Sequence, residues 1–284
     1  DLRNYLKNRS LSKAVQQCLA EHKSAKVRAT LAANTSADDD ILRPLITDPA
    51  AEVRAALLRD WWMDRTMELE LARDKEASVR KAVAGLERSR KTTQLLLAND
   101  PDQAVRTSLL KRDGFFMSTL HPLAQEALAR DKNQPIRELL AAYPRLKPSA
   151  QMLLSKDEKI GVRKALAKGH DEYIGGNLCE EAQLSLARDQ ESTVRLALAE
   201  NRHLHPAAQL LLAQDTLANV RLKLVEASSF RRQLAAQTLR VLVKDPDSNI
   251  RQELAGKLFG MLAMPCEEDV QLALASDRSM EVKH

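Results

Sequence analysis

The sequence predicts an all-α solenoid of about ten tandem two-helix repeats, and two observations support this prediction. The first is a sequence unit that recurs along nearly the whole chain of 284 residues. The second is the composition, because 44% of the residues are hydrophobic although only 3% are aromatic. A core of Leu, Ala and Val is typical of short helices that pack closely on small side chains.

The repeated unit is marked by a Val-Arg or Ile-Arg pair. Successive arginines are separated by 26, 26, 26, 31, 26, 32, 26 and 30 residues, and Val282-Lys283 follows 32 residues later. They number the repeats one to nine: Arg28, Arg54, Arg80, Arg106, Arg137, Arg163, Arg195, Arg221 and Arg251. From repeat two onward, an aspartate stands six residues before the basic residue of each pair: Asp48, Asp74, Asp100, Asp131, Asp157, Asp189, Asp215, Asp245 and Asp277. A leucine precedes that position by three residues in every repeat, which chance does not explain.

The unit L-A-x-D-x-x-x-x-V-R-x-x-L predicts two short helices. The first helix is expected to end near the aspartate, and the second to begin there with the aspartate as its N-cap. Three prolines follow an aspartate directly and are expected at the first helical position: Pro49, Pro101 and Pro246. Three more lie nine residues before an aspartate and are expected to start the first helix: Pro122, Pro148 and Pro206.

The arginine and aspartate columns are predicted to be scaffold. A unit of about 26 residues cannot bury its apolar face alone, whereas stacked neighbours can. The arginines adjoin the buried face, so each is expected to bond the aspartate of its own or a neighbouring repeat. The result would be a ladder along the stack.

The leucine, aspartate and Val-Arg columns, with the prolines before the first helices, resemble the leucine-rich repeat variant family and, more distantly, HEAT repeats. The resemblance covers almost the whole chain. It implies a right-handed superhelix of alternating short helices, some of them 3₁₀. One member of that family carries a cysteine-ligated iron–sulfur cluster before its repeats. Cys18, Cys179 and Cys266 do not match the ligands of that cluster, so no cofactor is expected.

The repeats are expected to form one domain over residues 1–284, regular in 1–112 and carrying loop insertions in 113–284. The insertions fall between the second helix of one repeat and the first helix of the next. Such connections lie along one edge of a solenoid. The chain begins and ends inside a repeat, so we expect either that its capping units are irregular or that it is a piece of a longer protein.

The same connections hold most of the aromatic residues, interleaved with basic ones. They form the candidate partner surface: Trp61, Trp62, Arg88, Arg90, Phe115, Phe116, Tyr143, Tyr173, Phe230, Arg231, Arg232 and Phe259. Aromatic and cationic side chains together are typical of protein hot spots and of surfaces that stack unpaired bases. The alternative is that the aromatics plug gaps between helices. Of the adjacent pair Trp61-Trp62, one indole is expected to pack and the other to be exposed.

Few sequence features indicate catalysis. His203-x-His205 has no adjacent third ligand, and Pro206 indicates a helix start, so no metal site is expected. The stretch "RDWWMD" at 59–64 resembles the tryptophans and aspartate of HEAT-like alkylpurine DNA glycosylases. In those enzymes the side chains line a basic cleft, whereas here Asp60, Asp64 and the tryptophans are consecutive in a connection.

The sequence therefore favours a non-enzymatic scaffold that binds another macromolecule. A protein partner is the first expectation, bound along the concave face or the aromatic and basic loop edge. The formal net charge of +5 permits nucleic acid as the alternative partner. A glycosylase-type enzyme is the least favoured hypothesis. No signal peptide is visible in the sequence, and no apolar run approaches the roughly 20 residues that span a bilayer, so no membrane association and a cytoplasmic location are expected.

Overall fold

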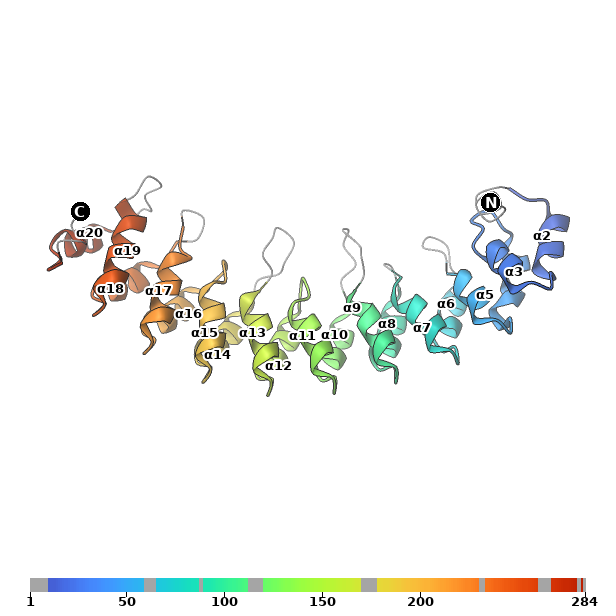
Figure 1. Ribbon diagram of the computed structural model, residues 1–284, viewed down its shortest axis with the longest axis horizontal. Helices are drawn as coiled ribbons and strands as arrows, with labels where there is room; N and C mark the ends of the chain where they lie inside the picture. Colours follow the sequence, from blue (N-terminus) through green and yellow to red (C-terminus); the bar gives the residue numbers. More distant parts are fainter. Residues whose placement is uncertain are drawn as a thin grey trace. The chain divides into compact units, whose positions relative to one another are not determined.

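A computed structural model describes residues 10–58, 65–86, 89–111, 120–169, 178–229, 233–259, 267–279 and 282. The fold is all-α, as predicted, and consists of short helices in tandem (Figure 1). The helices divide into two compact units, Asp1–Leu128 and Ala129–His284.

Unit 1 contains the helices of repeats one to four. Its first helices alternate with second helices along the chain. The elements are α2 (Lys13–Ala20), α3 (Ala25–Ala32), α4 (Asp39–Leu42), η1 (Arg43–Thr47), α5 (Ala51–Ala56), α6 (Arg65–Leu71), α7 (Ala77–Ala84), α8 (Lys91–Ala98) and α9 (Gln103–Leu110). Helix α10 (Pro122–Ala129) follows and ends at the boundary of the two units.

The 3₁₀ helix η1 has a local cause. Pro44 has no backbone N–H, so it cannot donate the α-helical bond to the carbonyl four residues earlier. Helix α4 therefore ends at Leu42, and the chain continues in the tighter geometry.

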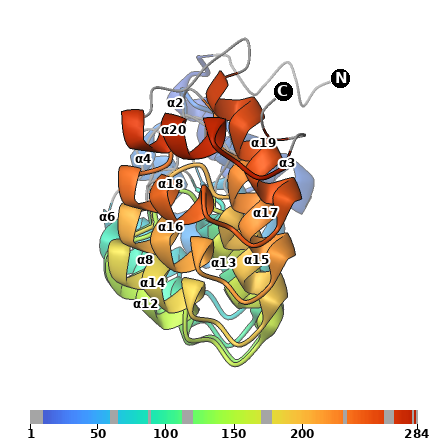
Figure 2. The same cartoon turned by 90° about the vertical axis from the view of Figure 1, so that its left-hand side faces the viewer.

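Unit 2 repeats the same alternation. Its elements are α11 (Gln134–Ala141), α12 (Pro148–Leu154), α13 (Ile160–Lys168), α14 (Glu180–Ala187), α15 (Ser192–Ala199), α16 (Pro206–Ala213), α17 (Ala218–Glu226), α18 (Ala236–Leu242), α19 (Ser248–Phe259) and α20 (Glu268–Ala275). Figure 2 shows α12, α14, α16 and α18 in one row and α13, α15 and α17 in another. Neighbouring helices within each of these rows pack against each other, so these repeats of unit 2 contact one another through both of their helices.

The predicted leucine and valine columns form the core. From Leu45 to Leu274 the column leucines are buried, and from Val53 to Ile250 so are the valines and isoleucines. In α7 the buried positions are Val79, Val83 and Ala84, which lie on the side that faces the first helix of the repeat and the neighbouring repeats.

The prediction for the start of the second helix is wrong in detail. The helix begins three residues after the aspartate, as at Ala77 and Gln103, and the N-cap lies two residues after it. The aspartate instead closes an Asx turn, because its Oδ1 accepts from the N–H two residues on, 2.8 Å for Asp74 and Glu76. Pro49 and its equivalents therefore lie in this turn, not in the helix. The prolines of the first helices are placed as predicted, since α10, α12 and α16 each begin at one.

Candidate partner surface

Most of the predicted partner surface lies outside the described residues. Only three of its members are described: Arg90, Tyr143 and Phe259. The other nine lie outside the described residues, and they include both tryptophans of "RDWWMD": Trp61, Trp62, Arg88, Phe115, Phe116, Tyr173, Phe230, Arg231 and Arg232. The aspartates of the glycosylase hypothesis, Asp60 and Asp64, lie outside them as well.

The three described members belong to three different repeats. Phe259 is the last residue of α19 and is 55% exposed. Tyr143 follows α11 in repeat five and is half-buried. Arg90 belongs to unit 1, where its Nη1 pairs with Glu68 Oε2 at 2.5 Å. Of the three, Phe259 is the most accessible to a partner.

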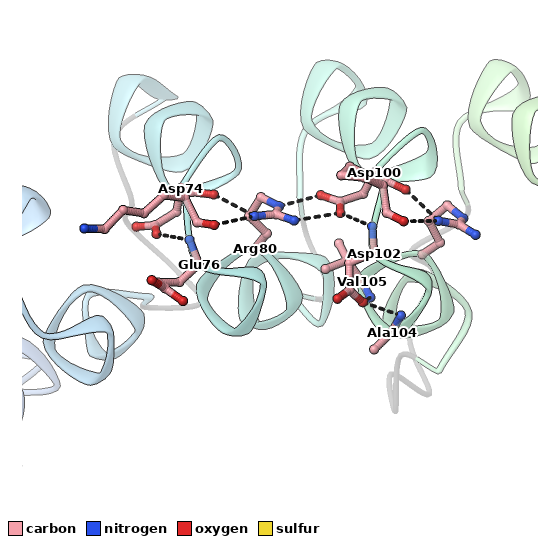
Figure 3. Close-up of polar contacts among 10 residues, drawn as sticks. Asp74, Glu76, Arg80, Asp100, Asp102, Ala104 and Val105 are labelled. Atoms are coloured by element: carbon pink, nitrogen blue, oxygen red, sulfur yellow. Dashed lines mark hydrogen bonds and ion pairs between the residues drawn. The ribbon is translucent and has the colours of Figure 1, made fainter.

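The arginine and aspartate columns form a hydrogen-bonded ladder along the second helices (Figure 3). Arg80 Nε donates to Asp100 Oδ2 at 2.7 Å and its Nη2 donates to Asp100 Oδ1 at 3.0 Å, so the pair is bidentate. The remaining nitrogen, Nη1, donates to the backbone carbonyls of Asp74 and Lys75. The carboxylate thus comes from the next repeat, and the carbonyls come from the arginine's own repeat.

The same geometry is found in repeats one, two and five to nine. Equivalent bidentate pairs are Arg28–Asp48, Arg54–Asp74, Arg137–Asp157, Arg163–Asp189, Arg195–Asp215, Arg221–Asp245 and Arg251–Asp277. Arg106 is buried, and its Nη1 donates to the carbonyls of Asp100 and Pro101. Asp131 closes its Asx turn with Asn133, and its carbonyl accepts from Arg137. Only a planar guanidinium presents donors in the fork that this arrangement uses.

The ladder is nearly excluded from water. In the pair Arg54–Asp74 the side chains are 5% and 6% exposed. Burial alone would raise the pKa of Asp74, but the hydrogen bonds from Arg54 and the Glu76 N–H lower it below its ordinary value. The hydrogen bond from Arg28 likewise lowers the pKa of Asp48. The carboxylates of Asp48 and Asp74 are therefore held ionised as parts of the scaffold.

A second ladder runs along the first helices and was missed in the sequence. It consists of buried glutamines six residues before the aspartate position: Gln16, Gln94, Gln125, Gln151, Gln183 and Gln209. Each Nε2 donates to the carbonyl five residues earlier, 2.9 Å for Gln151 and Leu146. The Oε1 atoms of five of them accept the N–H that precedes the next first helix, as Gln183 does from His205 at 2.7 Å; the five are Gln16, Gln94, Gln151, Gln183 and Gln209. The amide thus joins consecutive first helices.

Three repeats depart from the glutamine pattern. Glu68 takes the position in repeat three, where it accepts from both the backbone N–H and the side chain of Arg90. Leu42 and Leu239 take it in repeats two and nine. Each of these leucines is followed by an arginine that reaches the next first helix from the surface. Arg43 donates to Thr66, and Arg240 pairs with Glu267 and Asp269.

The histidine pair has structural roles. His205 is the N-cap of α16, and its Nδ1 accepts from the Ala207 N–H at 3.4 Å. The N–H of His203 donates to Asn201 Oδ1. Among the residues that the structure describes, no group of three or more His, Cys, Asp or Glu side chains could hold a metal ion. In the same part of the chain, no helix is both long enough and apolar enough to cross a membrane.

The buried columns and the stacked helix pairs define the chain as a tandem helical-repeat protein. Its fold is that of the leucine-rich repeat variants. It is similar to a solved structure described as "a leucine-rich repeat variant with a novel repetitive protein structural motif", with 26% sequence identity and a TM-score of 0.50. The match covers 84% of this chain and 88% of the other. No family model and no curated protein sequence matches the chain.

Proposed function

We propose that the chain is a non-enzymatic repeat scaffold that binds another protein through the exposed side of its second helices or through its inter-repeat loop edge. The proposal rests on one observation, which is that the side chains of the ladders use their hydrogen-bonding groups to join repeats. Their donors and acceptors bond other repeats and helix ends, so they are not available for chemistry on a substrate. What the ladders hold in place is a row of second helices with a repeated, preorganised surface, which lowers the entropic cost of binding.

Nucleic acid is the alternative partner, and salt separates the two. A protein that neutralises phosphates with Lys and Arg loses affinity steeply as salt rises, because binding releases counterions. An interface anchored by apolar side chains depends much less on salt.

The test is a fluorescence-anisotropy titration of the intact chain with labelled single- and double-stranded DNA and RNA, at low and at physiological salt. Peptides selected from a random library are titrated in parallel. Peptide binding that persists at physiological salt, without oligonucleotide binding, is the expected result. Oligonucleotide binding that survives physiological salt would replace the proposal with the nucleic-acid alternative. Arg231→Ala/Arg232→Ala then tests whether the loop edge takes part.

A further inference from the structure

The junction between repeats nine and ten differs from the three junctions that precede it along the first-helix row. In those junctions a buried glutamine joins consecutive first helices, and the glutamines are Gln151, Gln183 and Gln209. In repeat nine the same position holds Leu239, whose buried side chain has no hydrogen-bonding group. The buried amide link is therefore replaced where α20 follows α18.

Surface ion pairs of Arg240 link these two helices instead. Arg240 Nε donates to Asp269 Oδ2 at 2.8 Å, and its Nη2 pairs with Glu267 Oε2. Glu267 is the N-cap of α20 and Asp269 lies in its first turn, so both pairs hold the N-terminal end of that helix. The arginine side chain is 48% exposed and each acidic side chain 54%. Water and salt ions therefore reach these pairs.

The C-terminal end of α20 is held by the second-helix ladder. Asp277 comes directly after the C-cap of α20 and accepts two hydrogen bonds from Arg251 of α19, at 2.7 and 3.0 Å. The two side chains are only 14% and 6% exposed. Helix α20 thus has one end tied by a shielded ion pair and the other end tied by exposed ones.

Backbone packing is also looser between α18 and α20 than between α16 and α18. Seven residues before the ladder aspartate, α14 and α16 have the fully buried Ala182 and Ala208, and small side chains let helices approach closely. Thr238 and Val270 take this position in α18 and α20, and both are larger. The ion pairs of Arg240 therefore matter more at this junction than surface ion pairs usually do.

We propose that Arg240 is a salt-sensitive latch for α20. At low salt its pairs with Glu267 and Asp269 hold the N-terminal end of the helix against α18. At high salt the pairs are screened, because the Debye length falls from about 30 Å at 0.01 M to about 3 Å at 1 M. That end of α20 then opens, while the ladder pair keeps the C-terminal end attached.

Opening changes the surface that unit 2 offers to solvent. Leu239 is 4% exposed, and it takes the position from which glutamines of other repeats reach the next first helix. Separation of α20 from α18 therefore uncovers this apolar side chain. The equivalent junction of α16 and α18 stays closed, because the Gln209 amide is uncharged and buried, so salt does not weaken its bonds.

Amide hydrogen exchange of the intact chain, resolved by residue with NMR at about 0.01 M and about 1 M NaCl, tests the latch. The N–H groups of α20 should exchange about threefold faster at high salt, because two exposed ion pairs are screened. Those of α16, which lies between two buried glutamine links, should change little. The N–H of Ser279, which donates to Asp277 Oδ1 at 2.8 Å, should keep its protection, because the ladder pair stays closed.

Arg240→Met should reproduce the high-salt behaviour of α20 at low salt and abolish its dependence on salt. Lys244→Met is the matched control, because Lys244 is an exposed cation of the same repeat. This control should exchange like the unaltered chain at both salt concentrations. Thermal melts followed by circular dichroism verify that each variant is folded.

Leu239→Gln tests the latch from the opposite direction, because it restores the amide. The carbonyl of Leu234 and the N–H of Glu267 stand at the places of the partners of Gln209, which are the carbonyl of Leu204 and the N–H of Ala235. The variant should slow exchange in α20 and remove most of its dependence on salt.

Three results would overturn the latch. The first is a salt dependence of α20 that is no larger than that of α16. The second is a salt dependence that Arg240→Met or Leu239→Gln leaves unchanged. The third is loss of protection at Ser279 together with α20, because the whole of repeat ten would then detach and the ladder pair would not act as the fixed end.

Discussion

Each row of helices has its own ladder, and the residues of the second-helix ladder vary less from repeat to repeat than those of the first-helix ladder. Along the second helices, the eight bidentate pairs between Arg28 and Asp277 share one geometry. Along the first helices, glutamine gives way to Glu68, Leu42 and Leu239. A buried ion pair cannot lose one partner without leaving an uncompensated charge. A neutral amide can be replaced by an apolar side chain at a smaller cost, particularly where a surface arginine supplies another link.

The largest expected effect follows from removing one arginine of the second-helix ladder. Arg54→Met leaves the buried Asp74 carboxylate without its partner and removes the donor to two carbonyls. It should lower the free energy of unfolding by about 3 kcal/mol. Urea denaturation followed by circular dichroism measures this. Arg73→Met, at an exposed position in the next repeat, is the control and should change stability little. Equal effects of the two variants would contradict the structural role.

A break in the first-helix ladder should cost less. Gln183→Leu reproduces the residue found in repeats two and nine, but without the surface arginine that follows it there. The His205 N–H and the carbonyls of Leu178 and His203 lose their partner. The expected loss is about 2 kcal/mol in the same urea experiment. Gln190→Leu, at an exposed position, is the control. A loss as large as that of Arg54→Met would remove the distinction between the ladders.

The second-helix ladder should also make the protein sensitive to acid. The pKa values of Asp48 and Asp74 are lower in the folded chain than the ordinary value of 3.8, so the unfolded chain binds more protons near pH 4. Their contribution to stability is complete above about pH 5 and is lost as pH falls through the folded pKa values. Asp74→Asn should therefore lose less stability than the unaltered chain between neutral pH and pH 3. Identical slopes of stability against pH would contradict this.

The smallest expected effect concerns a buried hydroxyl group in the first-helix row. Thr238 precedes Leu239 and is fully buried, and its Oγ1 has no hydrogen-bond partner among the described residues. Thr238→Val keeps the shape and removes the unpaired hydroxyl. It should raise the free energy of unfolding by about 1 kcal/mol, measured by urea denaturation. Thr92→Val, on the exposed side of α8, should give no such gain. Destabilisation by Thr238→Val would show that the hydroxyl has a partner.

The two ladders also differ in how well the sequence predicts them. Arg and Asp at fixed spacing indicate a pairing because opposite charges beside a buried face need each other. The sequence left open whether the aspartate comes from the same repeat or the next, since both lie close to the arginine. The structure shows the carboxylate of the next repeat and the carbonyl of the same one, as Arg80 illustrates.

The glutamine column has an equally regular spacing, three residues before the column leucine, yet this spacing does not predict that the glutamines bond neighbouring repeats. Glutamine is a common residue on exposed helical surfaces, so its burial follows only from the stacking of the first helices. The N-cap assignment failed for a related reason. Aspartate both caps helices and closes Asx turns, and the sequence alone does not separate the two.

A double-mutant cycle on Arg221 and Asp245 tests the central claim most directly, because this pair is buried and bidentate. Arg221→Met, Asp245→Asn and the combined variant are compared with the unaltered chain by urea denaturation. Asparagine keeps an oxygen for the turn to the Asp247 N–H, so the cycle isolates the ion pair. We predict that the combined variant is less destabilised than the sum of the two single variants by about 2 kcal/mol. Simple additivity would contradict the claim that the ladder holds the repeats together.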